Sequence, residues 1–330
     1  MPVYNSEPYL QEAIASILDQ TFRDFTFLII NDGSTDTSGD IIESFDDPRI
    51  VYTCHETNKG LIATLNEGLA MVKNEYIIRM DADDVSYAGR IEKQIGFMDA
   101  NPGIDISGCR MAIDSGAGQI AHPGSPEACK VMLLDNTVLA HPSVIIRRES
   151  ILRGGLQFKE DAKHAEDFQF WVDATIAGLK IANYPEVLMR YRTHTGQVSV
   201  LQNDLQAETV KKIRAAYANH FFGDLLSGHS TLYQDLLQGT ISSFADFFSA
   251  KTLIKNLIAK NEEQGYFDGP IFESYINGLL KSAEFHMYVW GMDCNLKNLG
   301  RAFFDRSFYT ATSFPQKIRF ILKSLGKARS

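Results

Sequence analysis

The sequence predicts an α/β fold, in which a mostly parallel sheet is flanked by helices and followed by a helical C-terminal region. Short β-prone runs alternate with amphipathic helical patterns as far as about residue 100, which is typical of parallel strands joined by helical crossovers. Beyond about residue 200, helical patterns dominate and β-branched runs become rare. We therefore expect two parts, residues 1–200 and residues 201–330, each within the usual size of a domain.

The first hundred residues divide into strands that each end at a polar turn. Strands are expected at residues 1–5, 25–30, 50–53 and 76–78. Helices are expected at residues 7–20, from residue 61 onward and at 88–98, where apolar side chains recur every three or four positions. The first strand lacks the apolar half that such a strand usually has, which leaves open whether the native chain begins further upstream.

The middle of the chain keeps the same α/β character. Strands are expected at residues 104–113, 144–146, 181–184 and 187–193, and a helix at 165–177. In the helical part that follows, aromatic residues are expected to form the core: Phe221, Phe222, Phe244, Phe247 and Phe248.

Composition and charge narrow the class of protein. The 330 residues carry a formal net charge of −9, which argues against general nucleic-acid binding. The four cysteines have no paired spacing, so the sequence predicts neither a disulfide framework nor a zinc site and favours a reducing cytoplasm. No apolar run reaches the ~20 residues that span a bilayer, and the N-terminal residues do not have the pattern of a signal peptide.

A cluster of three carboxylates follows the strand expected at residues 76–78. Asp81, Asp83 and Asp84 fall within four positions, and alternation along an extended chain places Asp81 and Asp83 on the same side. Two such carboxylates form a hard-oxygen site suited to Mg²⁺ or Mn²⁺. Taken alone, the motif is more often a solvated turn, so its interpretation depends on the neighbouring strands.

Other polar residues fall at the carboxyl ends of the expected strands, namely Tyr4, Asp32, Lys59, Arg79 and Asp81. Because the carboxyl ends of parallel strands meet at one edge of a sheet, where open α/β folds bind ligands, we expect these residues to share one crevice. An aspartate there can accept hydrogen bonds from a base or from ribose hydroxyls. Individually, Asp32 is also typical of a type I turn and Lys59 of a solvated surface.

Six motifs occur in order along residues 1–200: Pro2-Val3-Tyr4-Asn5, Asn31-Asp32-Gly33-Ser34-Thr35-Asp36, Asn58-Lys59-Gly60, Arg79-Met80-Asp81-Ala82-Asp83-Asp84, Ala165-Glu166-Asp167-Phe168-Gln169-Phe170-Trp171 and Tyr191-Arg192-Thr193-His194. Together they resemble the signature of the family 2 inverting glycosyltransferases, which have a GT-A fold with a Rossmann-like nucleotide-sugar-binding sheet. Residues 147–158 and 165–199 most resemble bacterial lipooligosaccharide β-1,3-N-acetylglucosaminyltransferases.

The resemblance implies a role in nucleotide-sugar binding for the residues of the first four motifs. Asp32 and Arg79 would contact the uracil of a UDP-sugar, with Tyr4 and Lys59 beside it. Asp81 would contact the ribose. The same resemblance places further residues at the nucleotide sugar, namely Pro2, Asn5, Glu7, Ser34, Gly60 and Ala82.

The catalytic and metal positions follow from the same resemblance. Asp83 would bind a Mn²⁺ or Mg²⁺ ion that bridges the diphosphate, and His194 would be a further metal or diphosphate contact. Asp167 would be the catalytic base, although the sequence itself does not separate it from Glu166. The donor-sugar or acceptor side would hold His141, Glu166 and Trp171. Trp171 is equally well explained as a core residue.

The function implied is that of an inverting glycosyltransferase acting on a bacterial surface glycan or glycolipid, such as lipooligosaccharide, capsule or exopolysaccharide. GlcNAc in β linkage is the first choice of sugar, and UDP-Gal, UDP-Glc and UDP-GalNAc stay open as donors. A nucleotidyltransferase would carry a Gly-rich basic phosphate loop after its first strand, which this sequence lacks. A non-catalytic module that binds a nucleotide sugar or glycan is the alternative from another class, against which the presence of both Asp83 and Asp167 argues. The oligomeric state stays open.

The C-terminal end is basic and amphipathic. Residues 316–330 contain five basic residues and no acidic one, interspersed with apolar residues such as Ile318 and Phe320. On a helix this pattern gives an apolar face flanked by positive charge, which is typical of helices that lie on a membrane surface. We therefore expect a cytoplasmic protein held peripherally on the inner membrane, with a packed terminal helix as the alternative.

Overall fold

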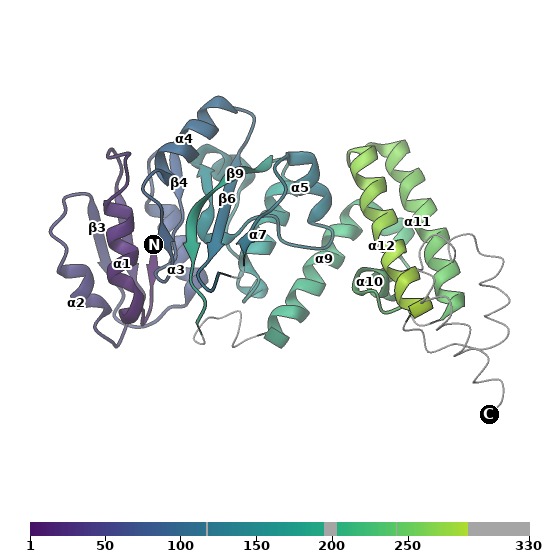
Figure 1. Ribbon diagram of the computed structural model, residues 1–330, viewed down its shortest axis with the longest axis horizontal. Coiled ribbons are helices and arrows are strands. Elements are labelled where there is room, and N and C mark those ends of the chain that lie inside the picture. Colours follow the sequence, from purple (N-terminus) through teal and green to yellow (C-terminus); the bar gives the residue numbers. More distant parts are fainter. Residues whose placement is uncertain (117, 195–202, 242, 290–330) are drawn as a thin grey trace. The chain divides into compact units, whose positions relative to one another are not determined.

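The computed structural model divides the chain into two units, Met1–Ile213 and Arg214–Ser330 (Figure 1). It describes residues 1–116, 118–194, 203–241 and 243–289. The basic C-terminal end, for which a membrane-surface helix is expected, lies outside the described residues. Among the helices that are described, none combines the length and the apolar character that a membrane crossing requires.

Three parallel strands form the first sheet of the N-terminal unit, in the order β1–β2–β3. These strands are β1 (Pro2–Val3), β2 (Phe27–Asn31) and β3 (Ile50–Cys54). The helices that follow them in turn are α1 (Glu7–Leu18), α2 (Ser38–Glu43) and α3 (Leu61–Met71). β1 is short and pairs only with the end of β2, where Pro2 lies opposite Ile30 and Val3 opposite Asn31. All three strands deliver their polar turns to one edge of this sheet.

The second sheet of this unit has the order β4–β8–β6–β9–β5, with β7 paired to β6. Its strands are β4 (Tyr76–Ile78), β5 (Val85–Ser86), β6 (Ile106–Ile113), β7 (Gln119–Ile120), β8 (Ile145–Arg147) and β9 (Ile181–Tyr191). β6 and β9 run parallel, whereas the other pairs are antiparallel. The α/β class predicted from the sequence is thus confirmed, with one parallel and one mixed sheet.

The second sheet differs from the sequence prediction in two places. The prediction makes β4 a fourth parallel strand, but β4 pairs antiparallel with β8, with Ile77 opposite Ile146. A three-residue apolar run is compatible with either direction, so the pattern does not encode the partner. The two strands predicted at residues 181–193 form the single strand β9, whose register jumps between Tyr184 and Val187. Pro185, which has no N–H to donate, lies in this bulge.

Helices cover the second sheet and one apolar cluster joins it to the first. The helices are α4 (Arg90–Ala100), α5 (Pro126–Met132), α6 (Arg148–Gly154) and α7 (Glu166–Ile176), with short 3₁₀ helices at His141–Ser143 and Glu160–Ala162. Buried side chains from α1 and both sheets form the cluster, among them Leu10, Ile14, Ile29, Met80, Met111 and Met189. Burying an apolar side chain of this size contributes roughly 1.5–3 kcal/mol, so α1 is held firmly between the sheets.

The C-terminal unit is helical in its described part. The helices that follow the second sheet in the chain are α9 (Asn203–Leu226), α10 (Ser230–Gln238), α11 (Phe244–Gln264) and α12 (Gly269–Val289). Phe267 stacks between Phe222 and Phe272, with ring centroids 5.9 and 5.2 Å apart. The aromatic core predicted for this part is confirmed for Phe222 and Phe247, which are buried, whereas Phe248 is 44% exposed.

Candidate active site

Side-chain hydrogen bonds fasten the turn after β1 to the turn after β2. Asn5, which has a left-handed φ of +48°, donates its N–H to Ser34 Oγ (3.0 Å). The Asn5 Oδ1 atom accepts the N–H of Thr35 (2.8 Å), and the N–H of Ser6 donates to Ser38 Oγ (2.9 Å). Asparagine tolerates the left-handed conformation better than most residues. Asn5 and Ser34, both predicted to bind the nucleotide sugar, therefore hold the two turns together.

Asp32 is buried at the end of β2 and holds the turn that opens α3. Its Oδ1 accepts the N–H of Lys59 (2.8 Å) and its Oδ2 that of Gly60 (2.9 Å). His55 Nδ1 lies 2.7 Å from Asp32 Oδ1, and His55 Nε2 lies 3.0 Å from Glu67. Burial alone would raise the pKa of Asp32, but these hydrogen bonds outweigh it and lower the pKa below its ordinary value.

Gly33 lets the loop after β3 come against the turn after β2. Its φ is +69°, and a Cβ atom there would lie 2.7 Å from the backbone nitrogen of Asn58. Any side chain at this position would push the two turns apart. The glycine therefore keeps Asp32 within reach of the backbone at Lys59.

Replacing His55 with alanine is expected to lower the free energy of unfolding by about 1–3 kcal/mol, because Asp32 stays buried but loses a hydrogen-bond partner. The folded-state pKa of Asp32 is lowered from 3.8, so this stabilisation is present above that pH and is lost as the pH falls through the folded-state value. Urea unfolding at pH 7 measures the effect, with the exposed neighbour Glu56→Ala as the matched control. Equal unfolding free energies for the two variants would contradict the role given to His55.

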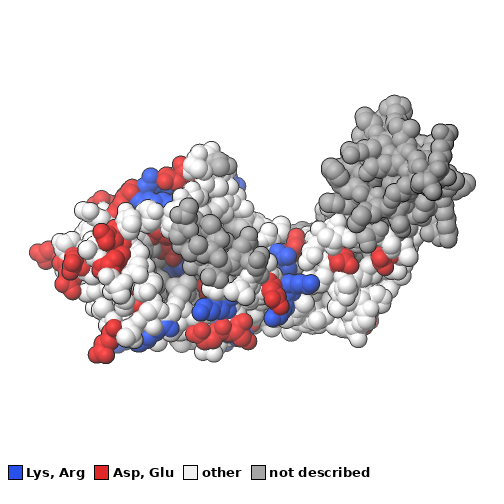
Figure 2. Space-filling model, turned by 90° about the horizontal axis from the view of Figure 1, so that it is seen from below, with Lys and Arg blue, Asp and Glu red and all other residues white. Residues whose placement is uncertain are grey.

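After β4 ends at Ile78, the chain turns through residues 79–84, which we call the acidic motif. One side-chain oxygen each of Asp81, Asp83 and Asp84 can be chosen so that all three lie within 4.8 Å of one another. The Ala82 side chain is buried in the core, so Asp81 and Asp83 share a side as predicted, although these residues form a turn and not a strand. Asp84 joins them, which the alternation does not predict. More generally, Figure 2 shows a face of the molecule on which acidic side chains are numerous over the left-hand part of the N-terminal unit.

The three carboxylates disfavour one another's charge. Burial, followed by the charges of Asp81 and Asp83, raises the pKa of Asp84 to about 8. Burial also raises the pKa of Asp81, and the charge of Asp83 adds to this while that of Arg79 opposes it. Asp84 Oδ1 accepts the N–H of Arg192 (3.1 Å), but the buried Oδ2 has no hydrogen-bond partner among the described residues. A divalent cation would relieve both the repulsion and the unsatisfied oxygen, so this donor set fits Mg²⁺ or Mn²⁺.

A buried arginine fixes the start of the acidic motif. Arg90 is fully buried and donates to the backbone oxygens of Arg79 and Pro142, each at 2.8 Å, and to Ser86 Oγ at 2.9 Å. Burial lowers the pKa of Arg90 to about 10, which leaves it charged at neutral pH. Arg79 in turn forms an ion pair with Asp81. The motif is thus held in place from the side of the sheet.

The end of β9 closes the other side of the motif. Arg192 donates to the backbone oxygen of Asp83 (2.8 Å) and forms an ion pair with Glu12. His194 Nε2 lies 3.0 Å from Asp83 Oδ2, and its ring centroid is 4.6 Å from that of Tyr9. The structure therefore brings together Asp83 and His194, which the sequence predicts as metal contacts.

Glu166 and Asp167 begin α7 as two half-buried carboxylates. Burial, and then the charge of Glu166, raise the pKa of Asp167 to about 6. Burial also raises the pKa of Glu166. The charge of Arg79 acts to lower this pKa, and the charge of Asp81 acts to raise it. The start of α7 therefore lies within electrostatic reach of the acidic motif. A carboxylate whose pKa lies near the working pH is suited to take up a proton in catalysis.

His141 and Trp171 belong to a buried aromatic cluster. Their ring centroids are 5.9 Å apart, and Phe158 lies 5.4 Å from His141. Trp171 is fully buried and offers no open indole face to a sugar, so its placement on the acceptor side is corrected in favour of the core alternative. Burial lowers the pKa of His141 well below its ordinary value, so its imidazole is neutral. Among the described residues, His141 Nε2 and Trp171 Nε1 have no hydrogen-bond partner.

Other predicted residues lie at the rim of this region. The Tyr4 ring is 49% exposed, and the Lys59 amine lies 3.2 Å from Glu67. Glu7, at the start of α1, accepts the N–H of Thr37 at 3.4 Å. Pro2 lies in the β1 strand opposite β2. The side chains of Tyr4, Glu7 and Lys59 are exposed and therefore open to a ligand.

Three residues that shape the site have no role in the sequence prediction, namely Asp84, Arg192 and His55. Asp84 directly follows Asp83 and is already counted in the cluster of three carboxylates, which is the signal for its role. Arg192 stands two positions before His194 in a motif already noted. His55 has no comparable signal, because its partners come from β2 and α3.

Known proteins are similar to this chain in sequence. Residues 1–155 match the family model described as Glycosyl transferase family 2. An uncharacterized glycosyltransferase of Haemophilus influenzae is 33% identical over 241 residues, which cover 67% of this chain and 73% of that protein. The chain belongs to glycosyltransferase family 2. It is therefore an enzyme that transfers a sugar from a nucleotide sugar, and the alternative of a non-catalytic binding module is not retained.

Solved structures are similar to this family 2 glycosyltransferase in fold. Staphylococcus aureus TarS 1–349 in complex with UDP-GlcNAc matches with a TM-score of 0.57 at 19% identity, covering 86% of this chain and 89% of that one. The GT-A fold predicted from the sequence is thereby confirmed. Escherichia coli WfaP, named UDP-Glc:alpha-D-GlcNAc-diphosphoundecaprenol beta-1,3-glucosyltransferase, is 28% identical over 199 residues, or 59% of this chain and 76% of WfaP. The narrower resemblance to lipooligosaccharide enzymes stays a prediction.

Proposed function

We propose that this family 2 glycosyltransferase transfers GlcNAc with inversion from UDP-GlcNAc to a hydroxyl of a bacterial surface glycan. One observation carries the proposal: three carboxylates converge within 4.8 Å, and Asp167, with a pKa of about 6, lies in the same electrostatic field. Arg79 acts on both groups. The acidic motif and α7 are different elements, so a metal site and a base can lie on either side of a sugar.

The chemistry assigns separate tasks to these carboxylates. Inversion by single displacement requires a base that takes the proton from the acceptor hydroxyl as its oxygen attacks C1 of the sugar. We assign this role to Asp167, which is ionised above pH about 6. When bound by Asp83 and His194, a divalent cation supplies positive charge against the departing diphosphate. Because the sugar of UDP-GlcNAc is α-linked, inversion gives a β-linked product.

The nucleotide is assigned to the turns at the carboxyl ends of the first sheet. Asp32 and Arg79 are proposed to contact the uracil, with Tyr4 and Lys59 beside it, and Asp81 to contact the ribose. The hydrogen bonds that fasten the turns after β1 and β2 support this assignment, because they bring the two turns to one edge. Further contacts are assigned to Pro2, Asn5, Glu7, Ser34, Gly60 and the backbone of Ala82.

The comparisons support a UDP-sugar and leave several sugars open. TarS was solved with UDP-GlcNAc, whereas the name of WfaP gives UDP-Glc as its donor. UDP-Glc is therefore an alternative to UDP-GlcNAc, and UDP-Gal and UDP-GalNAc stay open as in the sequence prediction. A mannosyltransferase of Pyrobaculum calidifontis, solved with GDP-Man and Mn²⁺, matches with a TM-score of 0.50 at 15% identity, covering 86% of this chain and 84% of that one.

Release of UDP across a panel of UDP-sugars tests the proposal, with Mn²⁺ or EDTA and with or without a lactose-terminated acceptor. We expect release from UDP-GlcNAc that needs Mn²⁺ and increases with the acceptor. Release from another UDP-sugar would keep the reaction class and overturn the choice of GlcNAc. Release that is unchanged by EDTA would contradict the metal site.

The basic C-terminal end is proposed to hold the enzyme on an anionic membrane surface. Each basic residue near such a surface contributes ~1 kcal/mol, and residues 316–330 contain five of them without an acidic one. Deleting residues 316–330 is therefore expected to weaken co-sedimentation with anionic vesicles by at least tenfold and to leave activity on a soluble acceptor intact. Neutral vesicles are the control. Equal sedimentation of the full and shortened chains would contradict this role.

A further inference from the structure

The chain reaches the start of α7 through residues 155–165, which we call the α7 approach. Within it, Glu160–Ala162 form a short 3₁₀ helix, and the other residues form no regular element. His164 has a left-handed φ of +71°, a conformation that residues with a Cβ atom rarely adopt. Such a conformation persists where the surrounding structure holds it. The position of Glu166 and Asp167 therefore depends on the contacts that fix the α7 approach.

Asn66, on α3, clamps the backbone of the α7 approach at Phe158. Its Nδ2 donates to the backbone oxygen of Phe158, and its Oδ1 accepts the N–H of the same residue, each at 2.8 Å. Phe158 is buried, so both of its backbone groups need a partner inside the protein. A side-chain amide carries a donor and an acceptor on neighbouring atoms, which a carboxylate does not. Asn66 thus bonds to Phe158 as a neighbouring strand would.

Phe158 connects this clamp to the helix that carries Asp167. Its ring stacks on that of Phe170, with the two ring centroids 4.5 Å apart. Phe170 is buried on α7 and lies three positions after Asp167, or about one helical turn. Because close-packed side chains transmit strain, a shift of Phe158 would also shift the start of α7.

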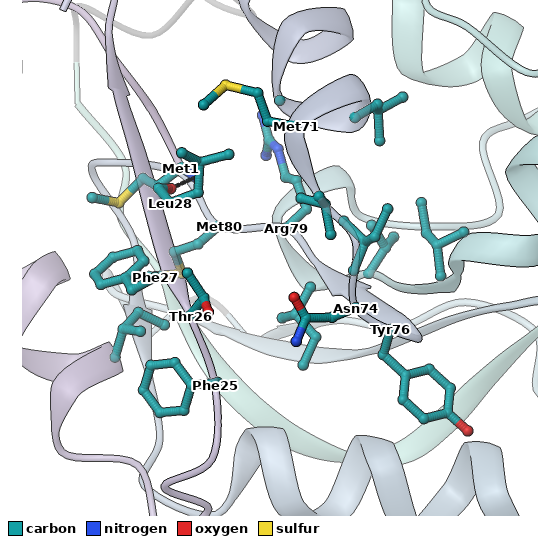
Figure 3. Close-up of a pocket in the computed structure, with 18 of the residues that line it drawn as sticks. Met1, Phe25, Thr26, Phe27, Leu28, Met71, Asn74, Tyr76, Arg79 and Met80 are labelled. Atoms are coloured by element: carbon teal, nitrogen blue, oxygen red, sulfur yellow. Dashed lines mark hydrogen bonds between the residues drawn. The ribbon is translucent and has the colours of Figure 1, made fainter. Parts of the chain in front are cut away.

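Packing leaves one side of Phe158 open. A cavity of about 740 Å³ lies between β2 and β4, with Phe27 and Tyr76 on opposite walls (Figure 3). Phe158 also lines this cavity, together with Leu65 and Gly68 of α3. A side chain beside a cavity loses the dispersion contacts that neighbours on that side would supply. The position of Phe158 therefore depends more strongly on its two hydrogen bonds with Asn66.

The helix that carries Asn66 begins at the turn assigned to the nucleotide. α3 starts after Gly60, whose N–H donates to Asp32, as does the N–H of Lys59. Asn66 lies six positions after Gly60, which is ~9 Å along the helix axis. α3 therefore connects the proposed nucleotide site to the α7 approach.

Two further contacts of the α7 approach come from other elements. Lys159 forms an ion pair with Asp173 of α7 itself, at 2.7 Å. Gln206 of α9 donates to the backbone oxygen of His164, at 2.8 Å. Neither contact involves an element that carries a residue assigned to the nucleotide, whereas the clamp by Asn66 does.

We propose that Asn66 is a positioning residue for sugar transfer, which holds Asp167 at a fixed distance from the turn that binds the nucleotide. The proposal rests on the function proposed above, in which Asp167 is the base. A base must lie within hydrogen-bond reach of the acceptor hydroxyl. A displacement of about 1 Å can lower the rate ~100-fold, so the clamp affects the chemical step more than the binding of the donor.

Comparison of Asn66→Ala with Asn261→Ala tests the proposal. Asn261 clamps the backbone of Phe267 with the same pair of hydrogen bonds, at 3.1 and 2.8 Å, in the C-terminal unit. With the UDP-sugar that the unmodified enzyme uses fastest, we expect Asn66→Ala to lower kcat at least ~10-fold. Calorimetry with UDP and Mn²⁺ is expected to give an unchanged affinity. Asn261→Ala is expected to lower the thermal midpoint and to keep kcat, because no residue of its unit is assigned to the reaction.

Amide hydrogen exchange at Phe168 separates a failure of this inference from a failure of the proposed function, because it requires no turnover. The N–H of Phe168 donates to Asp167 Oδ1 (2.7 Å) and so reports the order at the start of α7. We expect it to exchange at least ~10-fold faster in Asn66→Ala and at an unchanged rate in Asn261→Ala. Normal turnover of Asp167→Asn would contradict the proposed function and would leave this exchange result as it is.

Three outcomes would overturn the proposal. One is an unchanged exchange rate at Phe168 in Asn66→Ala. Another is an equal loss of kcat in Asn66→Ala and Asn261→Ala. The third is a loss of UDP affinity as large as the loss of kcat, which would place the defect in the nucleotide turn. Should Asn66→Ala fail to fold, Asn66→Asp carries the same measurements, because it keeps the acceptor for the N–H of Phe158 and removes the donor.

Discussion

Replacing Asp167 with asparagine is expected to lower kcat about 10³-fold and to leave UDP-sugar binding within a factor of about two. General-base catalysis contributes ~10²–10⁴-fold to the rate, and an amide cannot take the proton of the acceptor hydroxyl. The size and shape of the side chain stay nearly the same, so the donor site keeps its structure. Steady-state release of UDP measures the rate, and calorimetry with UDP-GlcNAc measures the binding.

The variant Glu166→Gln is the matched control, since it makes the same change at the neighbouring position. Asp167 as base predicts that kcat/KM rises with pH through about 6 in the unmodified enzyme, because the base must be ionised. The charge of Glu166 raises the pKa of Asp167, so this rise is expected at lower pH in Glu166→Gln. Near-normal turnover of Asp167→Asn, with loss of turnover in Glu166→Gln, would contradict the assignment and make Glu166 the base.

Replacing Asp83 with alanine is expected to weaken UDP binding at least ~100-fold in the presence of Mn²⁺, since a bound cation contributes several kcal/mol to charge stabilisation. In EDTA the affinity is expected to equal that of the unmodified enzyme. The metal-free protein is not expected to lose stability, because the change removes a charge that raises the pKa values of Asp81 and Asp84. Calorimetric titration of the variant and of the unmodified enzyme with UDP, each with Mn²⁺ and in EDTA, measures the four affinities needed.

Asp47→Ala is the control for this prediction. Asp47 forms an ion pair with Arg49 just before β3, at the opposite end of that strand from the crevice. Its replacement is expected to leave the effect of Mn²⁺ on UDP binding unchanged. If Mn²⁺ strengthens UDP binding in Asp83→Ala as much as in the unmodified enzyme, Asp83 does not bind the metal, and the proposed metal site is wrong.

Local patterns in the sequence predict the part of the site that depends on neighbouring residues. Asp81 and Asp83 share a side because Ala82 between them is buried, as strand-like alternation predicts. The burial of Asp84 depends on Arg192, which approaches from the end of β9, 108 positions along the chain. No local pattern contains that contact. The same holds for His55, which bridges residues of two other elements.

The fold shows the same division between local and long-range information. The position of α1 follows from apolar spacing, because its buried residues lie on one helical face. Those of β2 and β3 follow from short β-prone runs that end at polar turns. The antiparallel pairing of β4 does not, since three apolar residues fit beside a strand of either direction. Trp171 is a third case: helical spacing allows either a core or an exposed position, and packing against His141 decides for the core.

The most direct test of the central claim is the position of Mn²⁺ in a crystal of this enzyme with UDP, located by anomalous scattering. The account predicts one strong peak within ~2.2 Å of a carboxylate oxygen of Asp83, beside the diphosphate and on the side of His194. Bound UDP without a peak at Asp83, or a peak only at another site, would contradict the account.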